Sequence, residues 1–84
     1  MARINLHSMQ VLAAVASAKS LTRAAAELHM TPSAISKRIT ELELRFGTAL
    51  LVRNSAGVTL PPAGEIVGRS CNHIMVRVSE MTQE

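Results

Sequence analysis

Hydrophobic residues recur at intervals of three and four positions in four stretches of this chain, which is the spacing of one face of an α-helix. In the middle of the chain, a stretch of about two turns after Ser20 is followed, after a break of about three residues, by a longer stretch over residues 32–46. The pattern therefore predicts a short helix and a longer one joined by a tight turn. The apolar positions are Leu6, Met9, Leu12, Ala13 and Ala16, then Leu21, Ala24, Ala25 and Leu28, then Ile35, Ile39, Leu42 and Phe46, and finally Ala63, Val67, Cys71, Ile74, Val78 and Met81.

Residues with distinctive backbone preferences mark the ends of these helices. Asn5, Ser20 and Thr31 each precede a helical stretch and carry a side-chain oxygen that can accept a first-turn N–H, so we expect them to be N-caps. His29 stands where the turn needs a left-handed conformation, which His tolerates better than most residues, and Gly47 ends the longer helix in the same way. A short helix, a turn and a longer helix form the helix-turn-helix arrangement.

The outward face of the helix over residues 32–46 is small, polar and singly basic. If Ile35 faces the core, Ser33, Lys37 and Thr40 lie opposite and Ser36 lies on the flank. Such a surface fits the major groove of a DNA duplex. A solvated helix face is the usual alternative for an isolated amphipathic helix, and it is the preceding short helix that favours the DNA-reading interpretation.

Two short β-prone runs, Leu50–Arg53 and Val58–Leu60, predict a hairpin after that helix. The intervening residues 54–57 have the composition of a turn. A hairpin in this position would be a wing, with Arg53 and Asn54 near its tip able to reach a phosphate or the minor groove. The alternative is a structural hairpin carrying a solvated arginine.

The last stretch, from Pro62 to Glu84, predicts a helix about 34 Å long, which exceeds what so small a core can cover. Its apolar stripe has nearly the repeat of a helix–helix seam, so we expect part of it to meet a second copy of the chain. The alternative, packing across its own domain, suits only the first two turns. Gly64 and Gly68 form a GxxxG pattern, a weak signal in a helix of this kind. The residues expected to make the dimer contact are Val67, Cys71, Ile74, Val78 and Met81.

Length, charge and cysteine content narrow the classes of function. The 84 residues make one small domain, which is too small for a large internal active site. Nine Lys and Arg against six Glu give a net charge of +3 and favour, slightly, a polyanionic partner. Cys71 is the only cysteine and cannot form an internal disulfide, which fits a reducing cytoplasm. No apolar run approaches the length that spans a bilayer.

An enzyme is the least favoured class. The chain has no Asp, no Ser-x-x-Lys and no glycine loop suited to phosphates, and its three histidines fall on separate predicted elements. Cys71 and His73 alternate on one helix and cannot share a metal ion, so we expect no metal and no cofactor. A protein-interaction module is the second alternative to DNA binding, in which Ser33, Ser36 and Lys37 would be ordinary surface residues.

Taken together, several short motifs resemble the N-terminal DNA-binding domain of LysR-type bacterial transcriptional regulators, over essentially the whole chain. The resemblance implies a mainly α fold: a winged helix-turn-helix with a three-helix core and a small β-hairpin wing over residues 1–61, then a long linker helix over residues 62–84. The motifs are Ser20–Ala25 with Leu28-His29, Ser33–Ile39, Leu42-Glu43, Phe46-Gly47, Leu50–Arg53 and Ala63-Gly64.

The resemblance also implies roles for individual residues. Thr22 and Thr31 would contact phosphates, and Arg53 would serve the wing. Apart from the resemblance, the basic Arg23, Thr40 on the outward helix face and Asn54 near the hairpin tip complete the candidate interface with duplex DNA. The residues expected against base edges in the major groove are Pro32, Ser33, Ser36 and Lys37.

This chain departs from the family pattern at three positions. Pro32 replaces a common Gln, and Lys37 replaces the commoner Arg, so we expect a softer base preference. Pro61 stands where a Thr usually caps the linker helix. In the family, linker helices pair in a homodimer and a larger C-terminal domain binds an effector. We expect this chain to contain only the DNA-binding part, with no effector domain and no membrane partner.

Overall fold

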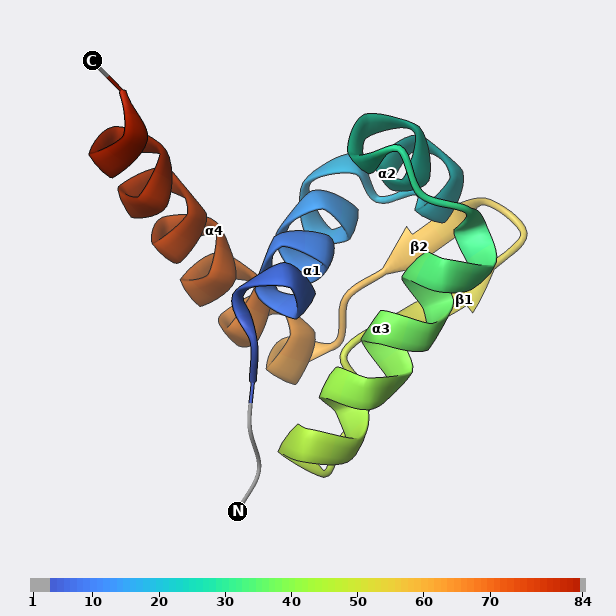
Figure 1. Cartoon of the computed structure of the whole chain (residues 1–84). Helices are drawn as coiled ribbons and strands as arrows, with labels where there is room; N and C mark the ends of the chain where they lie inside the picture. The colour runs from blue at the N-terminus through green and yellow to red at the C-terminus, as the bar shows by residue number, and fades with distance from the viewer. Residues whose placement is uncertain (1–3, 84) are drawn as a thin grey trace.

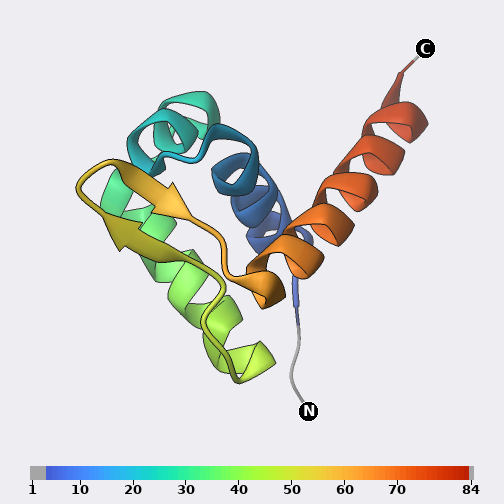
Figure 2. The ribbon, with the colours of Figure 1, turned by 180° about the vertical axis from the view of Figure 1, so that it is seen from behind.

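The computed structural model describes residues 4–83 as a three-helix bundle, a small hairpin and a protruding C-terminal helix (Figure 1). The hairpin follows the third helix and lies behind it in Figure 1, and Figure 2 presents the hairpin from the opposite side. The predicted winged helix-turn-helix fold is confirmed. The elements are α1 (Leu6–Ala18), α2 (Leu21–Leu28), α3 (Pro32–Phe46), β1 (Val52–Asn54), β2 (Gly57–Thr59) and α4 (Pro62–Thr82).

Side-chain caps define where the first three helices begin. The cap residues have extended backbones, and each side-chain oxygen accepts one N–H of the first turn, which leaves fewer unpaired donors there. All three predicted caps are therefore confirmed. The bonds run from the Ser8 N–H to Asn5 Oδ1 (2.7 Å), from the Arg23 N–H to Ser20 Oγ (3.1 Å) and from the Ala34 N–H to Thr31 Oγ1 (3.1 Å).

The turn between α2 and α3 is a Schellman motif centred on His29. His29 has φ 56°, the left-handed conformation predicted for it, and the Met30 N–H donates to the Ala25 carbonyl at 2.9 Å. Gly47 ends α3 with φ 70°, also as predicted. Lys19 ends α1 in the same left-handed region, which no residue preference of lysine could have indicated.

The core lies between α1, α3 and the segment that leads to the hairpin. Ala24 and Ala25 are buried as well, and their small side chains let α2 approach its neighbours closely. Two predicted core residues are wrong: Leu6 is 45% exposed and Phe46 is 42% exposed. Both lie in terminal turns of their helices, where the apolar periodicity continues beyond the bundle. The largest fully buried side chains are Leu12, Ile35, Ile39, Leu42, Leu50, Val11 and Val15.

The turn of the hairpin is shorter than the four residues, 54–57, that the composition predicts. β1 and β2 are antiparallel, and Asn54 pairs with Gly57, so the turn contains only Ser55 and Ala56. The predicted four-residue break is therefore wrong, because its outer two residues belong to the ladder. The predicted strand residues Leu50 and Leu51 lie before β1 and bury their side chains in the core.

The first half of α4 packs on the rest of the chain. Gly64 and Gly68 are buried, and a Cβ on Gly64 would overlap the Leu50 carbonyl. Cys71 is 4% exposed, and this burial raises the pKa of its thiol. Its assignment to an intermolecular seam is corrected here, because its side chain packs against the chain's own core. The predicted helix end at Glu84 lies outside the described residues.

Along residues 4–83 the structure contains no helix with the length and apolar character needed to cross a membrane.

Candidate nucleic-acid interface

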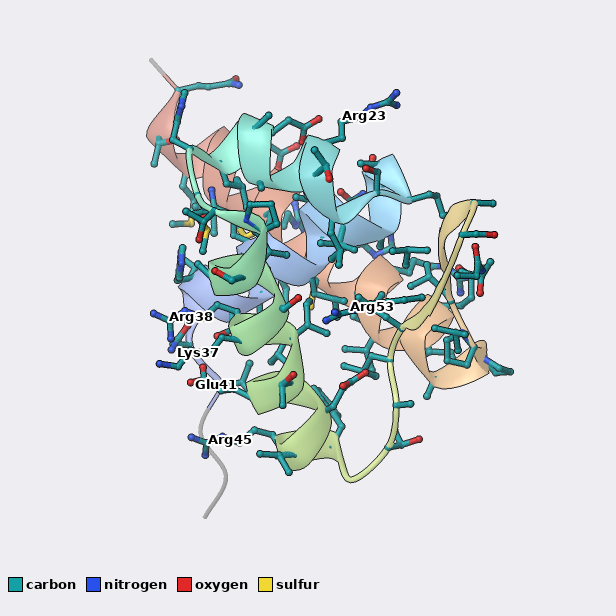
Figure 3. The ribbon with its side chains drawn as sticks, turned by 90° about the vertical axis from the view of Figure 1, so that its right-hand side faces the viewer. Arg23, Lys37, Arg38, Glu41, Arg45 and Arg53 are labelled. Atoms are coloured by element: carbon teal, nitrogen blue, oxygen red, sulfur yellow. The ribbon has the colours of Figure 1, made fainter. Side chains whose placement is uncertain are left out.

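The face of α3 turned away from the core carries the residues predicted to meet DNA. Ser33, Lys37 and Thr40 are exposed, opposite the buried Ile35 and Ile39. Figure 3 views the molecule from the side on which α3 crosses in front of the bundle. The predicted residues Thr31 and Pro32 are exposed as well, and Ser36 is half-buried on the flank. Over residues 31–40 the outward face of α3 is therefore mainly polar and open to solvent, whereas Leu44 further along the helix is 78% exposed.

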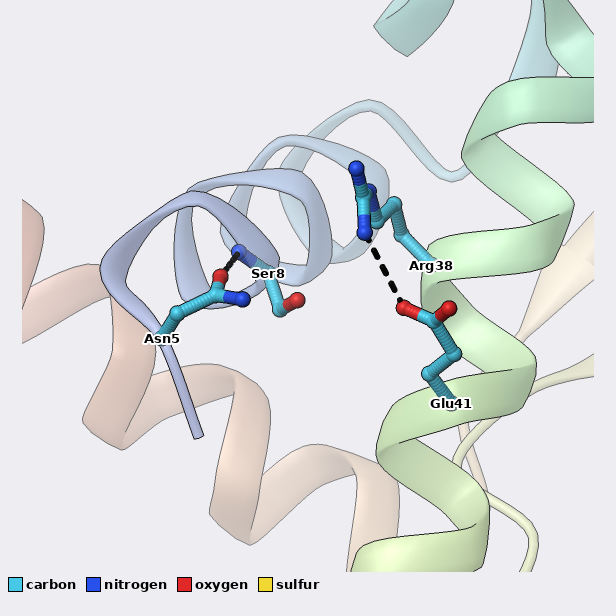
Figure 4. A network of polar contacts seen from close by, with 4 residues as sticks. All are labelled: Asn5, Ser8, Arg38 and Glu41. Carbon is cyan, nitrogen blue, oxygen red and sulfur yellow. Dashed lines mark hydrogen bonds and ion pairs between the residues drawn. The ribbon is translucent and has the colours of Figure 1, made fainter. Parts of the chain in front are cut away.

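Two adjacent cations on α3 are held differently. Arg38 Nη1 lies 3.1 Å from Glu41 Oε1, one turn further along the same helix (Figure 4). Within residues 4–83, Lys37 forms no ion pair. Among residues 4–83, Lys37 is thus available for an external partner, as is the exposed Arg45 in the last turn of α3, whereas Arg38 is engaged within the chain.

The N-terminus of α3 presents two hydroxyls and the positive end of the helix dipole. Thr31 Oγ1 lies 3.3 Å from Ser33 Oγ while also capping the helix through the Ala34 N–H. Hydroxyl donors at a helix N-terminus favour an anionic group. This corner of the fold can therefore accept a phosphate oxygen.

The start of α2 and the wing meet across a shallow surface pocket of about 220 Å³. Thr22 lines it from α2, and Arg53 and Asn54 line it from β1, so three predicted interface residues from distant parts of the sequence are brought together. In Figure 3 the Arg53 side chain lies between the wing and α3, while Arg23 extends outward from α2. Asn54 Oδ1 accepts the Ala56 N–H at 2.9 Å, which leaves its NH₂ group to donate.

Comparison with known proteins identifies the family. Residues 6–65 match the family described as "Bacterial regulatory helix-turn-helix protein, lysR family". The chain belongs to this family. The predicted LysR-type DNA-binding domain is thereby confirmed, and residues 4–83 are referred to below as the LysR domain.

Individual relatives agree with this assignment. The LysR domain is 38% identical over 79 residues to the RuBisCO operon transcriptional regulator of Acidithiobacillus ferrooxidans, covering 94% of this chain and 26% of that protein. It is 36% identical over 80 residues to the regulator MetR of Escherichia coli, covering 95% of this chain and 25% of that protein. The crystal structure of a BenM_DBD/catB site 1 DNA complex superimposes with a TM-score of 0.86 at 28% identity, over 93% of this chain and 88% of that one. The chain thus spans about a quarter of the length of these two full-length regulators.

Sequence reasoning missed two contacts that support the wing of the LysR domain. The carboxylate of Glu43 accepts the Leu50 and Leu51 N–H groups, and the Lys19 carbonyl accepts the Val58 N–H at 3.2 Å. Glu43 was part of one family motif, but periodicity assigns no role to it. The Lys19 contact uses a backbone carbonyl, which no side-chain pattern reports.

Proposed function

We propose that the LysR domain binds duplex DNA in a sequence-specific manner, with α3 in the major groove. The observation that carries this proposal is the exposed polar face of α3, with Ser33 and Lys37 directed to solvent while α2 braces the helix through the turn at His29. A braced helix with an open polar face is what base-edge contact requires. A face occluded by the chain itself would not allow it.

Contacts to the DNA backbone would come from the elements on either side of α3. Thr22, Arg53 and Asn54 line one pocket, and Arg23 follows Thr22 on α2, so this region is suited to phosphate groups beside the groove. Thr31 would add a hydroxyl contact from the start of α3. These contacts would set the position of the domain, while the face of α3 reads the sequence.

The base preference should be softer than that of a domain with Gln and Arg in the corresponding positions. Pro32 offers an apolar contact, such as to a thymine methyl group, in place of an amide that pairs with adenine. Lys37 supplies a point charge and not the planar two-pronged group that pairs with guanine. Thr40 extends the same exposed face toward the middle of α3.

We also propose that two copies act together through the apolar stripe of α4, mainly along its outer half. Ile74 is 39% exposed and Met81 is 78% exposed, and Val67 and Val78 are half-buried in the single chain. Pairing these residues about a two-fold axis would place two α3 helices at half-sites roughly 34 Å apart. The domain would then serve a bacterial transcription regulator in the cytoplasm, without catalysing a reaction of its own.

The proposal is tested by selecting bound duplexes from a random-sequence pool and titrating the selected duplex at several salt concentrations. We expect Lys37→Ala to lower affinity and to relax base preference at one position, by about 1 kcal/mol of discrimination. Arg53→Ala should weaken binding to all duplexes alike and reduce the slope of log K against log salt by about 0.9. Arg77→Ala, which removes an exposed α4 cation away from this face, is the matched control.

Equal affinity of the parent chain, Lys37→Ala and Arg53→Ala for the selected duplex would contradict the assigned roles. Failure of the parent chain to bind any duplex at low salt would instead favour a protein-interaction module.

A further inference from the structure

Glu43 connects the end of α3 to the segment that leads into the wing. Its Oε2 atom accepts the Leu50 N–H at 2.9 Å and the Leu51 N–H at 3.3 Å. Neither residue belongs to a strand, so the hairpin ladder does not pair these two donors. Their buried side chains hold this backbone against the core, where an unpaired N–H would be costly.

The main chain of Glu43 acts on the same loop. Its carbonyl accepts the Gly47 N–H at 2.8 Å and the Thr48 N–H at 3.2 Å. One residue therefore takes four N–H groups of the segment 47–51, two through its backbone and two through its side chain. Since β1 begins at Val52, these bonds determine where the first strand of the wing starts relative to α3.

The second strand is held from another direction. The Val58 N–H donates to the Lys19 carbonyl at 3.2 Å, at the junction of α1 and α2. Gly57 has φ 131°, and a Cβ there would lie 2.9 Å from the same carbonyl, so only glycine allows this approach. The wing is thus tied to the helix-turn-helix at both strands, and Glu43 is the only side chain among these ties.

We propose that Glu43 is a positioning residue, which holds the wing in place so that Arg53 meets DNA together with α3. This inference rests on the proposed function. Arg53 lies two residues beyond Leu51, so a displacement of this segment moves its guanidinium directly. A wing that is already held in place loses less conformational entropy when DNA binds. Glu43 would therefore raise affinity without contacting DNA itself.

The negative charge of Glu43 means that electrostatics and positioning predict opposite changes in DNA affinity when Glu43 is replaced. Glu43 is anionic and lies on the helix that approaches DNA, so removing its charge would by itself strengthen binding to a polyanion. Loss of affinity on removing it therefore indicates positioning. Glu41→Leu is the matched control, because Glu41 lies on the same helix and its carboxylate pairs only with the surface residue Arg38 among residues 4–83.

The experiment compares Glu43→Leu, Glu43→Gln and Glu41→Leu in the 84-residue chain, using the duplex selected from the random pool. We expect Glu43→Leu to weaken binding about tenfold and Glu43→Gln about threefold, since the amide oxygen of Gln can still accept these N–H groups but without the negative charge that strengthens the bonds. Glu41→Leu should bind at least as tightly as the parent. If Glu43→Leu does not fold, Glu43→Gln alone decides.

A double-mutant cycle separates positioning from general destabilisation. In an Arg53→Ala background, adding Glu43→Leu should lower DNA affinity by less than about threefold, because the guanidinium that Glu43 positions is already absent. In a Lys37→Ala background, the same change should lower DNA affinity as much as it does in the parent chain. In the free chain, amide exchange should accelerate at Leu50 and Leu51, whose N–H groups donate to Glu43, and stay unchanged at Val15.

Binding of both Glu43 variants as tight as that of Glu41→Leu would overturn the proposal, as would full additivity with Arg53→Ala or unchanged exchange at Leu50 and Leu51. If the parent chain binds no duplex, the proposed function fails and takes the DNA role of Glu43 with it. Accelerated exchange would then still report that Glu43 holds this segment of the free chain.

Discussion

Single residues decide which side chains of α3 face outward and which are used within the chain. Lys37 and Arg38 are adjacent and chemically similar, yet a step of about 100° around the helix separates a cation facing solvent from one paired with Glu41. Thr31 has two functions of this kind, since its hydroxyl caps α3 and lies beside Ser33 on the outer surface. The same hydroxyl therefore contributes to the stability of α3 and to the proposed DNA interface.

Thr31→Ala should destabilise the fold by about 1 kcal/mol, because the Ala34 N–H loses its side-chain acceptor. For a domain of this size, that corresponds to a fall in melting temperature of about 4–8 °C, measured by circular dichroism. Thr31→Ser keeps the cap oxygen and should melt close to the parent. Equal melting of the Ala and Ser variants would show that the cap contributes nothing.

At the scale of elements, α4 has an inner face near its start and an outer face further along. Gly64 and Gly68 allow the first turns to approach Leu50 and Ala16, so the GxxxG pattern serves packing within the chain. Beyond Cys71 the helix leaves the bundle (Figure 1), and Ile74, Val76 and Met81 are exposed, although Met75 still packs against the core. The apolar repeat predicted the helix, and its length predicted that only the first turns would pack on the chain's own domain. Neither showed that Cys71 lies on the packed side.

Gly64→Ala and Gly68→Ala, four residues apart on the same helix, should differ in stability. At Gly64 the added methyl overlaps the Leu50 backbone, and we expect a loss of about 1–3 kcal/mol from overpacking. At Gly68 the new Cβ lies 3.1 Å from the Ala16 Cβ, a tight contact offset by the gain of up to about 1 kcal/mol in helix propensity. Urea titration of both variants gives the comparison. Equal destabilisation would contradict the close approach at Leu50.

At the scale of the whole molecule, α4 extends the LysR domain to 41 Å along its longest axis, well beyond the helical bundle. An arm with exposed apolar residues on so small a domain is a surface suited to another chain. The proposed pairing would therefore couple the spacing of two α3 helices to the packing of two α4 helices. The half-site spacing that the dimer can bind would then be set by how its two α4 helices pack.

Met81→Glu and Ile74→Glu should weaken self-association at least tenfold, because each would place a charge in the proposed apolar contact. Ser79→Glu adds the same charge at an exposed position of α4 outside the stripe and is the control. Sedimentation velocity over a concentration series measures the effect, with circular dichroism to show that helix content is retained. A parent chain that stays monomeric at every concentration, or a control as weak as the two variants, would refute the α4 contact.

The sequence by itself determined where the first three helices begin, where α2 and α3 end, and how these two form the helix-turn-helix. Caps such as Thr31, the left-handed turn at His29 and the stop at Gly47 depend on bonds within about five residues, so local chemistry is sufficient for them. The tertiary structure alone decided that Phe46 is exposed, that Cys71 is buried and that Glu43 holds the wing. Those outcomes depend on where a helix outruns its neighbours and where the chain folds back, and periodicity along the sequence contains no information about either.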